Sequence, residues 1–356
     1  MAMRYCLTLT CHVLPLLLLL TGVWACGERG PENQGDEPAR NETAATTDTS
    51  GQPLLSIQAL NDTLGQRTDN PQLWYQRAQQ RTRQENYRKA LEDVKTALVL
   101  DSTFIDAHLL MAELYWQLAY PQGTLKALRT ARRLAPENHP RLGMLLGRYL
   151  WMMKEHEASF KALNKSLEKD PYQPEVYFIK GMNYKEMVRP ERAISSFQTA
   201  VELDPEYYDA YFQLGLLYLD STGSTLGKDY LRRARKIQHG AEVSHALGDY
   251  WRLRDSLPKA SGHYHRGLQM KGESASLHYN LGYVQWAQDS FEAAVRHFGL
   301  ANRYAPSNKH YLYALGMARR DAGDPSGARQ AFRRALELDS DFQDARQGLN
   351  MLNDGR

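Results

Sequence analysis

Two stretches of the chain carry nearly the same pattern: residues 193–205 read Ala-Ile-Ser-Ser-Phe-Gln-Thr-Ala-Val-Glu-Leu-Asp-Pro, and residues 328–340 read Ala-Arg-Gln-Ala-Phe-Arg-Arg-Ala-Leu-Glu-Leu-Asp-Ser. Steps of about 34 residues from either stretch find the same unit eight times. Each unit begins its pattern with a small residue, and further small residues follow 12 and 19 positions later. The leading small residues are Ala78, Ala112, Gly147, Gly181, Gly215, Gly248, Gly282 and Gly316. This period predicts one repeat array in place of the two or more globular domains that 356 residues would otherwise suggest.

Each unit shows two helical patterns, separated by a turn and closed by a breaker such as Asp-Pro or Ala-Pro. Small side chains allow two helices to approach where they cross, and large side chains fill the core between the crossings. Large residues recur on the second helix of several units, for example Phe197, Tyr264 and Phe332. The chain is therefore predicted to be all-α.

The fourth unit resembles the tetratricopeptide repeat (TPR) family, and the whole chain is similar to bacterial envelope lipoproteins that contain such repeats. The third unit matches least well, because Leu150 replaces the usual Tyr and Ser159 and Ser166 replace alanines. The resemblance implies an α-solenoid, a right-handed superhelix of about eight helix-turn-helix repeats with capping helices at both ends. The residues that carry it are Tyr177, Gly181, Tyr184, Ala193, Phe197, Ala200 and Pro205.

The repeat register divides the chain into three parts: residues 1–25, residues 26–53, and a solenoid over residues 54–356. No segment outside the repeats is large enough for a catalytic domain. We therefore expect that the protein is not an enzyme and binds no cofactor. The predicted repeats are 71–104, 105–139, 140–173, 174–207, 208–240, 241–274, 275–308 and 309–342, with a closing helix at 342–352.

The N-terminal 25 residues have the pattern of a secretory signal, with Arg4 ahead of an apolar run that ends at Leu16–Leu20. Val23-Trp-Ala-Cys26 resembles the bacterial lipobox, although Trp24 stands where a small residue is usual. The resemblance implies that Cys26 is lipidated and that the protein is anchored in a cell envelope, on the outer membrane of a Gram-negative bacterium. Ordinary signal cleavage with soluble export, and an uncut membrane anchor, are the alternatives.

Residues 26–53 are rich in Gly, Pro, Thr and acidic side chains and predict a solvated linker between the anchor and the solenoid. All three cysteines (Cys6, Cys11 and Cys26) lie in the first 26 residues, so the solenoid lacks any disulfide, cysteine nucleophile or cysteine metal ligand. The net charge of +3 is too small to favour nucleic acid as a partner. The sequence also lacks a phosphate-binding Gly-rich loop and a Gly-x-Ser-x-Gly motif.

The family resemblance implies a concave groove lined by the first helix of each repeat, which would bind a peptide or helix of a protein partner. Aromatic and Met side chains dominate the implied positions and favour protein contact. Chaperone-type carboxylate recognition is not expected, because Tyr75 and Gln79 replace the Lys and Asn of that clamp. The predicted groove residues are Tyr75, Leu109, Glu113, Trp116, Met144, Arg148, Trp151, Phe178, Met182, Phe212, His245, Asp249, Arg252, Tyr279, Tyr283, Trp286, Tyr313, Met317 and Arg320.

Two other interpretations of this groove remain open. Its side chains could pack against neighbouring helices, or the aromatic rings could stack on a glycan or another small ligand. The function predicted from the sequence is thus a non-catalytic, lipid-anchored interaction scaffold for outer-membrane assembly, secretion or cell-wall complexes, with an envelope substrate-binding protein as the alternative. The sequence gives no indication of the oligomeric state.

Seven of the 11 histidines fall between residues 239 and 310, including the pair His263 and His265. Residues two apart on a helix point in different directions, so this pair does not predict a metal site. Basic clusters at 232–236 and at 126–133 lie on second helices, the outer wall of the solenoid. They predict solvated helix faces, with anionic headgroups or acidic partners as the alternative.

Overall fold

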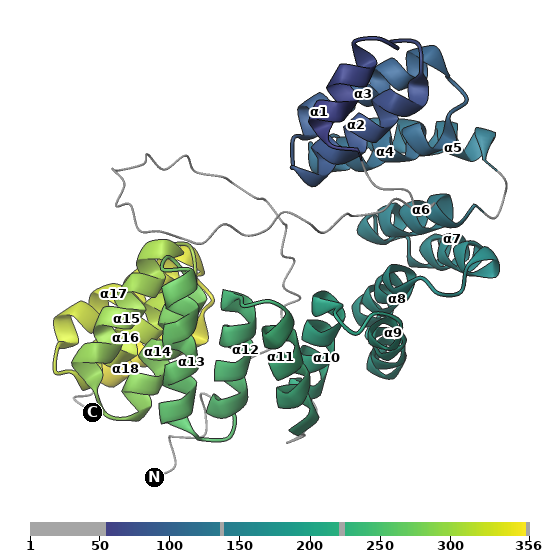
Figure 1. Cartoon of the computed structure of the whole chain (residues 1–356). Coiled ribbons are helices and arrows are strands. Elements are labelled where there is room, and N and C mark those ends of the chain that lie inside the picture. The colour runs from purple at the N-terminus through teal and green to yellow at the C-terminus, as the bar shows by residue number, and fades with distance from the viewer. Residues whose placement is uncertain (1–54, 136–138, 221–224, 354–356) are drawn as a thin grey trace, which may run out of the picture. The chain divides into compact units, whose positions relative to one another are not determined.

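The computed structural model divides the chain into two units, Met1–Leu54 and Leu55–Arg356, and describes residues 55–135, 139–220 and 225–353. These residues form helices and no strand, which confirms the predicted all-α solenoid (Figure 1). In chain order the helices are α1 (Ile57–Leu64), α2 (Pro71–Arg83), α3 (Tyr87–Leu100), α4 (Ile105–Gln117), α5 (Pro121–Leu134), α6 (Pro140–Met152), α7 (His156–Lys169), α8 (Pro174–Glu186), α9 (Pro190–Leu203), α10 (Tyr208–Asp220), α11 (Thr225–Ile237), α12 (Ala241–Arg252), α13 (Leu257–Met270), α14 (Ala275–Ala287), α15 (Phe291–Tyr304), α16 (Lys309–Asp321), α17 (Pro325–Leu338) and α18 (Gln343–Asn353).

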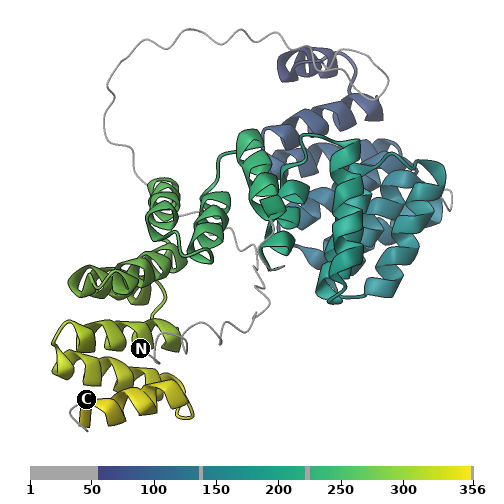
Figure 2. The same cartoon turned by 90° about the horizontal axis from the view of Figure 1, so that it is seen from below.

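Helices α2 to α17 form eight hairpins, one for each predicted repeat. The two helices of a hairpin make the most extensive contacts, and the second helix then packs on the first helix of the next repeat. Several first helices also contact the first helix of the next repeat, as α6 contacts α8. Seen from below, the hairpins from green to yellow lie side by side in chain order (Figure 2). α1 packs on the first hairpin and α18 on the last, so both ends of the array are covered.

The small residue of each first helix lies beneath a large residue 16 positions later on the second helix. A Cβ atom added to Gly181 would lie 2.5 Å from Cε1 of Phe197, far inside normal contact distance. Gly248 and Tyr264 form an equivalent pair, in which the added Cβ would lie 2.3 Å from the Tyr264 ring. Phe197 and Tyr264 are both fully buried, so glycine is required here to let an aromatic ring fill the helix crossing.

Each described turn within a hairpin contains one residue in the left-handed region of backbone space. Six of these residues are not glycine, and the seventh is Gly323 with φ of 81°. Val188, with φ of 55°, is the most unfavourable, because a β-branched side chain crowds the backbone in this conformation. The six are Glu85, Ala119, Lys154, Val188, Asp255 and Asp289. The turn geometry is therefore kept even where the sequence does not favour it.

A buried polar network explains one of the two serines that replace alanine in the third repeat. Ser159 on α7 is fully buried, and its hydroxyl donates to the carbonyl of Gly147 on α6 at 2.7 Å. The same hydroxyl accepts a hydrogen bond of 3.0 Å from Asn183 Nδ2 on α8, which is also fully buried. His156 Nδ1 lies 3.0 Å from Asn183 Oδ1 and completes the network. The network joins the third repeat to the fourth by hydrogen bonds, whereas five other repeats have alanine at the position of Ser159.

The predicted signal at 1–25, the lipidation site Cys26 and the linker up to residue 53 lie outside the described residues. Among the residues that the structure describes, no helix combines the length and the apolar composition that a membrane crossing requires.

Candidate functional site

The predicted groove residues lie on the first helices, α2 to α16, at equivalent places in successive repeats. Most of them are half-buried, so part of each side chain reaches solvent. The half-buried residues are Glu113, Trp116, Met144, Arg148, Trp151, Phe178, Met182, Phe212, His245, Asp249, Arg252, Tyr279, Tyr283, Trp286, Tyr313, Met317 and Arg320. We call the face that carries them the first-helix face.

Two of the predicted groove residues belong to the core instead. Leu109 is fully buried and packs with Leu128 and Leu142, so it offers no surface to a partner. Tyr75 is only 6% exposed and its ring lies 4.9 Å from that of Phe104. The prediction is corrected for both residues, because the following hairpin covers them.

Arg141, which the sequence analysis did not select, organises the N-terminal part of the first-helix face. Its guanidinium lies on α6 and donates to Glu113 of α4 at 3.0 Å and to the Tyr75 hydroxyl of α2 at 3.1 Å. Asp106 adds a third contact at 3.7 Å. Burial alone would lower the pKa of Arg141, but Glu113 and Tyr75 raise it above its ordinary value. The only feature of the sequence that indicates this role is that a charged residue occupies the second position of the third repeat.

Further along the chain, groove residues of α6 pair with residues of α8. Arg148 forms an ion pair with Glu175. The indole N–H of Trp151 donates to Glu186 at 2.8 Å. Both contacts link the first helices of neighbouring repeats, so these two predicted groove residues also fix the spacing of the repeats.

Asp249 is the centre of a polar cluster in the sixth and seventh repeats. Its carboxylate accepts hydrogen bonds from the Tyr264 hydroxyl at 2.8 Å and from Asn280 Nδ2 at 3.0 Å. Asn280 Nδ2 also lies 2.7 Å from His245 Nε2, and Arg252 Nε lies 3.7 Å from Asp249. Burial and the nearby Asp249 raise the pKa of Tyr264, so its hydroxyl stays protonated as the donor.

Three tryptophans of the first-helix face differ in how their indole N–H groups are used. Trp151 is bonded to Glu186, and Trp286 donates to Asp321 at 2.8 Å. Trp116 is half-buried, and no side chain of the described residues makes a hydrogen bond or ring contact with it. Among these three tryptophans, Trp116 is the one whose indole N–H is not bonded to a described side chain.

The histidines are not arranged as a metal centre, since no group of three or more His, Cys, Asp or Glu converges within the described residues. His278 Nδ1 and His297 Nδ1 lie 3.1 Å apart, a hydrogen bond in which one ring donates and the other accepts. Burial, with smaller contributions from His278, His265 and Arg296, lowers the pKa of His297 to about 4. This pair is therefore neutral at physiological pH.

Residues 174–207 and 279–342 each match a family model described as tetratricopeptide repeat. Anaphase-promoting complex subunit 3 of Schizosaccharomyces pombe is 20% identical over 178 residues, which cover 50% of this chain and 27% of that protein. Human tetratricopeptide repeat protein 16 is 22% identical over 282 residues, 69% of this chain and 32% of that protein. The chain thus spans about a third or less of the length of these two relatives.

Solved structures share the fold at low sequence identity. The APC/C hetero-tetramer Cut9–Hcn1 superposes with a TM-score of 0.60 at 15% identity, over 83% of this chain and 58% of that chain. A tetratricopeptide repeat protein from Parabacteroides merdae gives a TM-score of 0.51 at 12% identity, over 70% of this chain and 98% of that chain. The two family-model matches and the eight helical hairpins of the described residues support a tetratricopeptide repeat protein, and the solved structures show the same fold.

Proposed function

We propose that this protein is a non-catalytic scaffold that binds a peptide or helix of a protein partner along the first-helix face. The observation that carries this proposal is the partial exposure of aromatic and Met side chains on successive first helices. Such side chains give large contact areas with a polar group at one end, and the binding energy of interfaces concentrates on a few of them. The tetratricopeptide fold supports such a role, since it displays one helix face of every repeat to the same side.

The N-terminal part of this face is the most suitable place for the partner. Trp116 keeps a free indole N–H, and Met144 and Met182 present adaptable apolar side chains on the next two first helices. The ion pairs Arg141–Glu113 and Arg148–Glu175 hold these helices at a fixed spacing. A rigid row of anchors lowers the entropy lost when an extended segment binds.

The test is crosslinking in native envelopes, followed by mass spectrometry of the captured partner. Trp116→Ala should reduce the yield of the partner crosslink at least about tenfold, because hot-spot truncations cost about 2 kcal/mol or more. Tyr172→Ala is the matched control, since Tyr172 is 76% exposed and lies in the connection between α7 and α8. Equal loss of the crosslink in both variants, or in neither, would contradict the proposal.

We further propose that Cys26 is lipidated and that the protein is held in a bacterial cell envelope, on the outer membrane. The support is the Val23-Trp-Ala-Cys26 sequence after an apolar run, followed by a polar linker. Labelled palmitate should enter the wild type and fail to enter Cys26→Ala. Label in the Cys26→Ala variant, or none in the wild type, would remove the anchor from the proposal and leave the scaffold role intact.

A further inference from the structure

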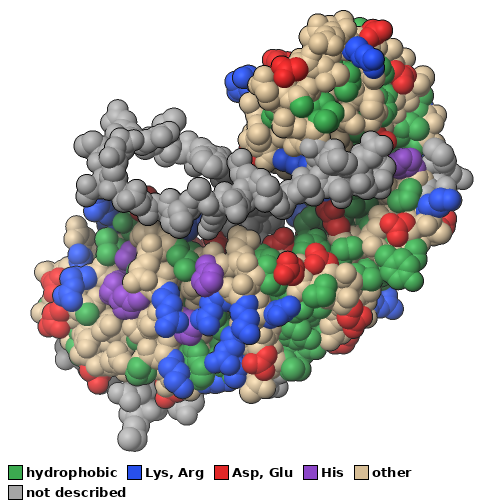
Figure 3. Space-filling model, in the orientation of Figure 1, with side chains coloured by type: hydrophobic (Ala, Val, Ile, Leu, Met, Phe, Trp, Pro, Cys, Tyr) green, Lys and Arg blue, Asp and Glu red, His purple; other side chains and the backbone are tan. Residues whose placement is uncertain are grey.

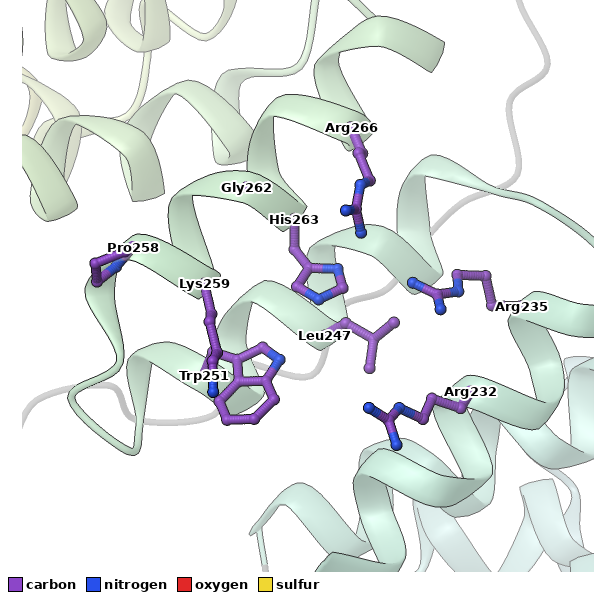
Figure 4. A pocket seen from close by; sticks show the side chains of 9 residues that line it. All are labelled: Arg232, Arg235, Leu247, Trp251, Pro258, Lys259, Gly262, His263 and Arg266. Carbon is purple, nitrogen blue, oxygen red and sulfur yellow. The ribbon is translucent and has the colours of Figure 1, made fainter.

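A basic pocket of about 500 Å³ lies among three consecutive helices, α11, α12 and α13 (Figure 4). Arg232 and Arg235 border it from α11, and Lys259, His263 and Arg266 border it from α13. The side chains of Leu247 and Trp251 enter it from α12 (Figure 4). We call this cavity the Arg232 pocket.

Ion pairs of the described residues leave the positive charge of the Arg232 pocket without a counter-charge. Among the described residues, no carboxylate forms an ion pair with any of its three arginines or with Lys259. Lys259 instead lies 4.2 Å from the Trp251 ring centroid as a cation–π contact. An adjoining hollow of about 480 Å³ adds Arg233 and Lys236 and only one acidic residue, Asp229. Figure 3 shows Lys and Arg side chains gathered on the surface of this region.

His263 supplies a further polar group to the Arg232 pocket. Its ring points into the space between the two helices that carry the arginines (Figure 4). Its Nδ1 atom is buried and makes no hydrogen bond within the described residues. Burial, together with Arg266, Arg235 and Arg232, lowers the pKa of His263 to about 4. A neutral imidazole with an unused nitrogen can hydrogen-bond a ligand without adding like charge.

Repulsion among these side chains is a cost that a bound anion would remove. Arg232 and Arg235 are three residues apart on α11 and share one helix face, and Arg266 borders the same pocket from α13. Like charges that are neighbours on one helix face repel each other and destabilise the helix. Because the pocket brings the two faces together, the repulsion adds across the helices as well as along them.

We propose that the Arg232 pocket binds a phosphate-type oxyanion, carried either by a small soluble molecule or by a lipid headgroup. Guanidinium groups donate in a planar fork that matches two oxygens of a phosphate, and three of them border this space. The cavity is larger than a phosphate, and the apolar floor of Leu247 and Trp251 leaves room for the carbon skeleton that carries it. This site is separate from the first-helix face, so the proposal does not depend on partner binding there.

The test uses the full chain with Cys26→Ala as the parent, so that lipidation does not attach the protein to vesicles. In the first arm of the test, titration calorimetry measures the binding of two small soluble phosphates, inorganic pyrophosphate and glycerol 3-phosphate. In the second arm, co-sedimentation with phosphatidylcholine vesicles, with and without phosphatidic acid, measures binding to a lipid headgroup. We expect saturable binding in at least one arm, and the stronger arm identifies the source of the phosphate.

The variant Arg235→Gln/Arg266→Gln should weaken this binding at least about tenfold while the helical circular dichroism stays unchanged. The matched control is Arg132→Gln/Arg133→Gln, an exposed basic pair on α5 that borders neither hollow. If both double variants lose binding equally, the attraction is general electrostatics and the pocket proposal is wrong. An absence of binding by the parent in both arms would also overturn it.

Histidine resonances provide a second readout of the same proposal. A bound phosphate neutralises the arginines that face His263, so its titration midpoint should rise in the presence of pyrophosphate. The resonance is assigned by its absence in the His263→Gln variant. A His263 midpoint that does not move while pyrophosphate binds would place the anion elsewhere and contradict the assignment to this pocket.

Discussion

Replacing Gly181 by alanine tests the packing argument directly, because the added Cβ has a known neighbour. It would lie 2.5 Å from Phe197 Cε1, so the ring or one of the helices must move by about 1 Å. Overpacking of this kind costs about 1–3 kcal/mol. Alanine also favours a helix over glycine by about 1 kcal/mol, which offsets part of that cost. The net expectation is a loss of up to about 2 kcal/mol.

Gly262→Ala is the matched control, since Gly262 also lies within a helix, α13, and a Cβ added there meets nothing within 4 Å. The same gain in helix propensity should stabilise this variant by about 1 kcal/mol. The difference between the two variants isolates the packing cost, about 1–3 kcal/mol. Urea unfolding followed by circular dichroism gives the global values. Hydrogen exchange of α8 and α9 gives the free energy of local unfolding. Both measurements are needed because solenoids need not unfold in one step.

The second repeat of this chain shows which pair of residues could relieve the overpacking. In the second repeat, alanine at position 112 faces Leu128 instead of an aromatic ring. Gly181→Ala/Phe197→Leu should therefore be more stable than the sum of the two single changes predicts, by about 0.5 kcal/mol or more. If Gly181→Ala is as stable as Gly262→Ala, or if the double variant shows no coupling, the packing explanation is wrong.

Three further predictions concern buried polar groups, backbone strain and acid. Ser159→Ala should cost about 1–3 kcal/mol, because it removes a partner of the buried Asn183 side chain, and Ser159→Ala/Asn183→Leu should recover part of that loss in urea unfolding. Val188→Gly should raise the thermal midpoint by relieving the left-handed conformation, whereas Val99→Gly, equally exposed but inside α3, should lower it. Because the folded-state pKa of His297 is about 4, the unfolded chain binds an extra proton between about pH 6.5 and pH 4, so stability should fall as the pH is lowered through this range. His297→Gln should make the midpoint less dependent on pH in that range, and an unchanged pH profile would contradict the assignment.

The sequence predicts most of the fold, because small and large residues alternate with a period that only stacked helical hairpins satisfy. It does not predict the polar network of the third repeat. Ser159 looks like a poor match to the family until Asn183, 24 residues later, is seen to bond to it. The position of Leu109 in the repeat predicts a groove residue, but Leu128 and Leu142 pack against it and leave it fully buried.

The two candidate sites differ in how far they follow from the sequence. The first-helix face repeats every 34 residues or so, and its residues could be selected by position. The Arg232 pocket has no such regularity, because it depends on two second helices, α11 and α13, facing each other across α12. The sequence indicates only the cluster at 232–236, as a solvated helix face or a contact for anionic headgroups or acidic partners. The stacking of the hairpins brings Lys259 and Arg266 of α13 to the same cavity.

The contacts of Arg141 have a consequence for cooperativity. In an array where each repeat touches only its neighbours, repeats can unfold one at a time from the ends. Arg141 in the third repeat reaches both Glu113 in the second and Tyr75 in the first, so it adds a second-neighbour coupling. Fraying of the first hairpin would break the half-buried hydrogen bond that Arg141, two repeats away, donates to Tyr75. The first three repeats should therefore exchange their amide protons as a single unit, while the remaining hairpins open by smaller steps.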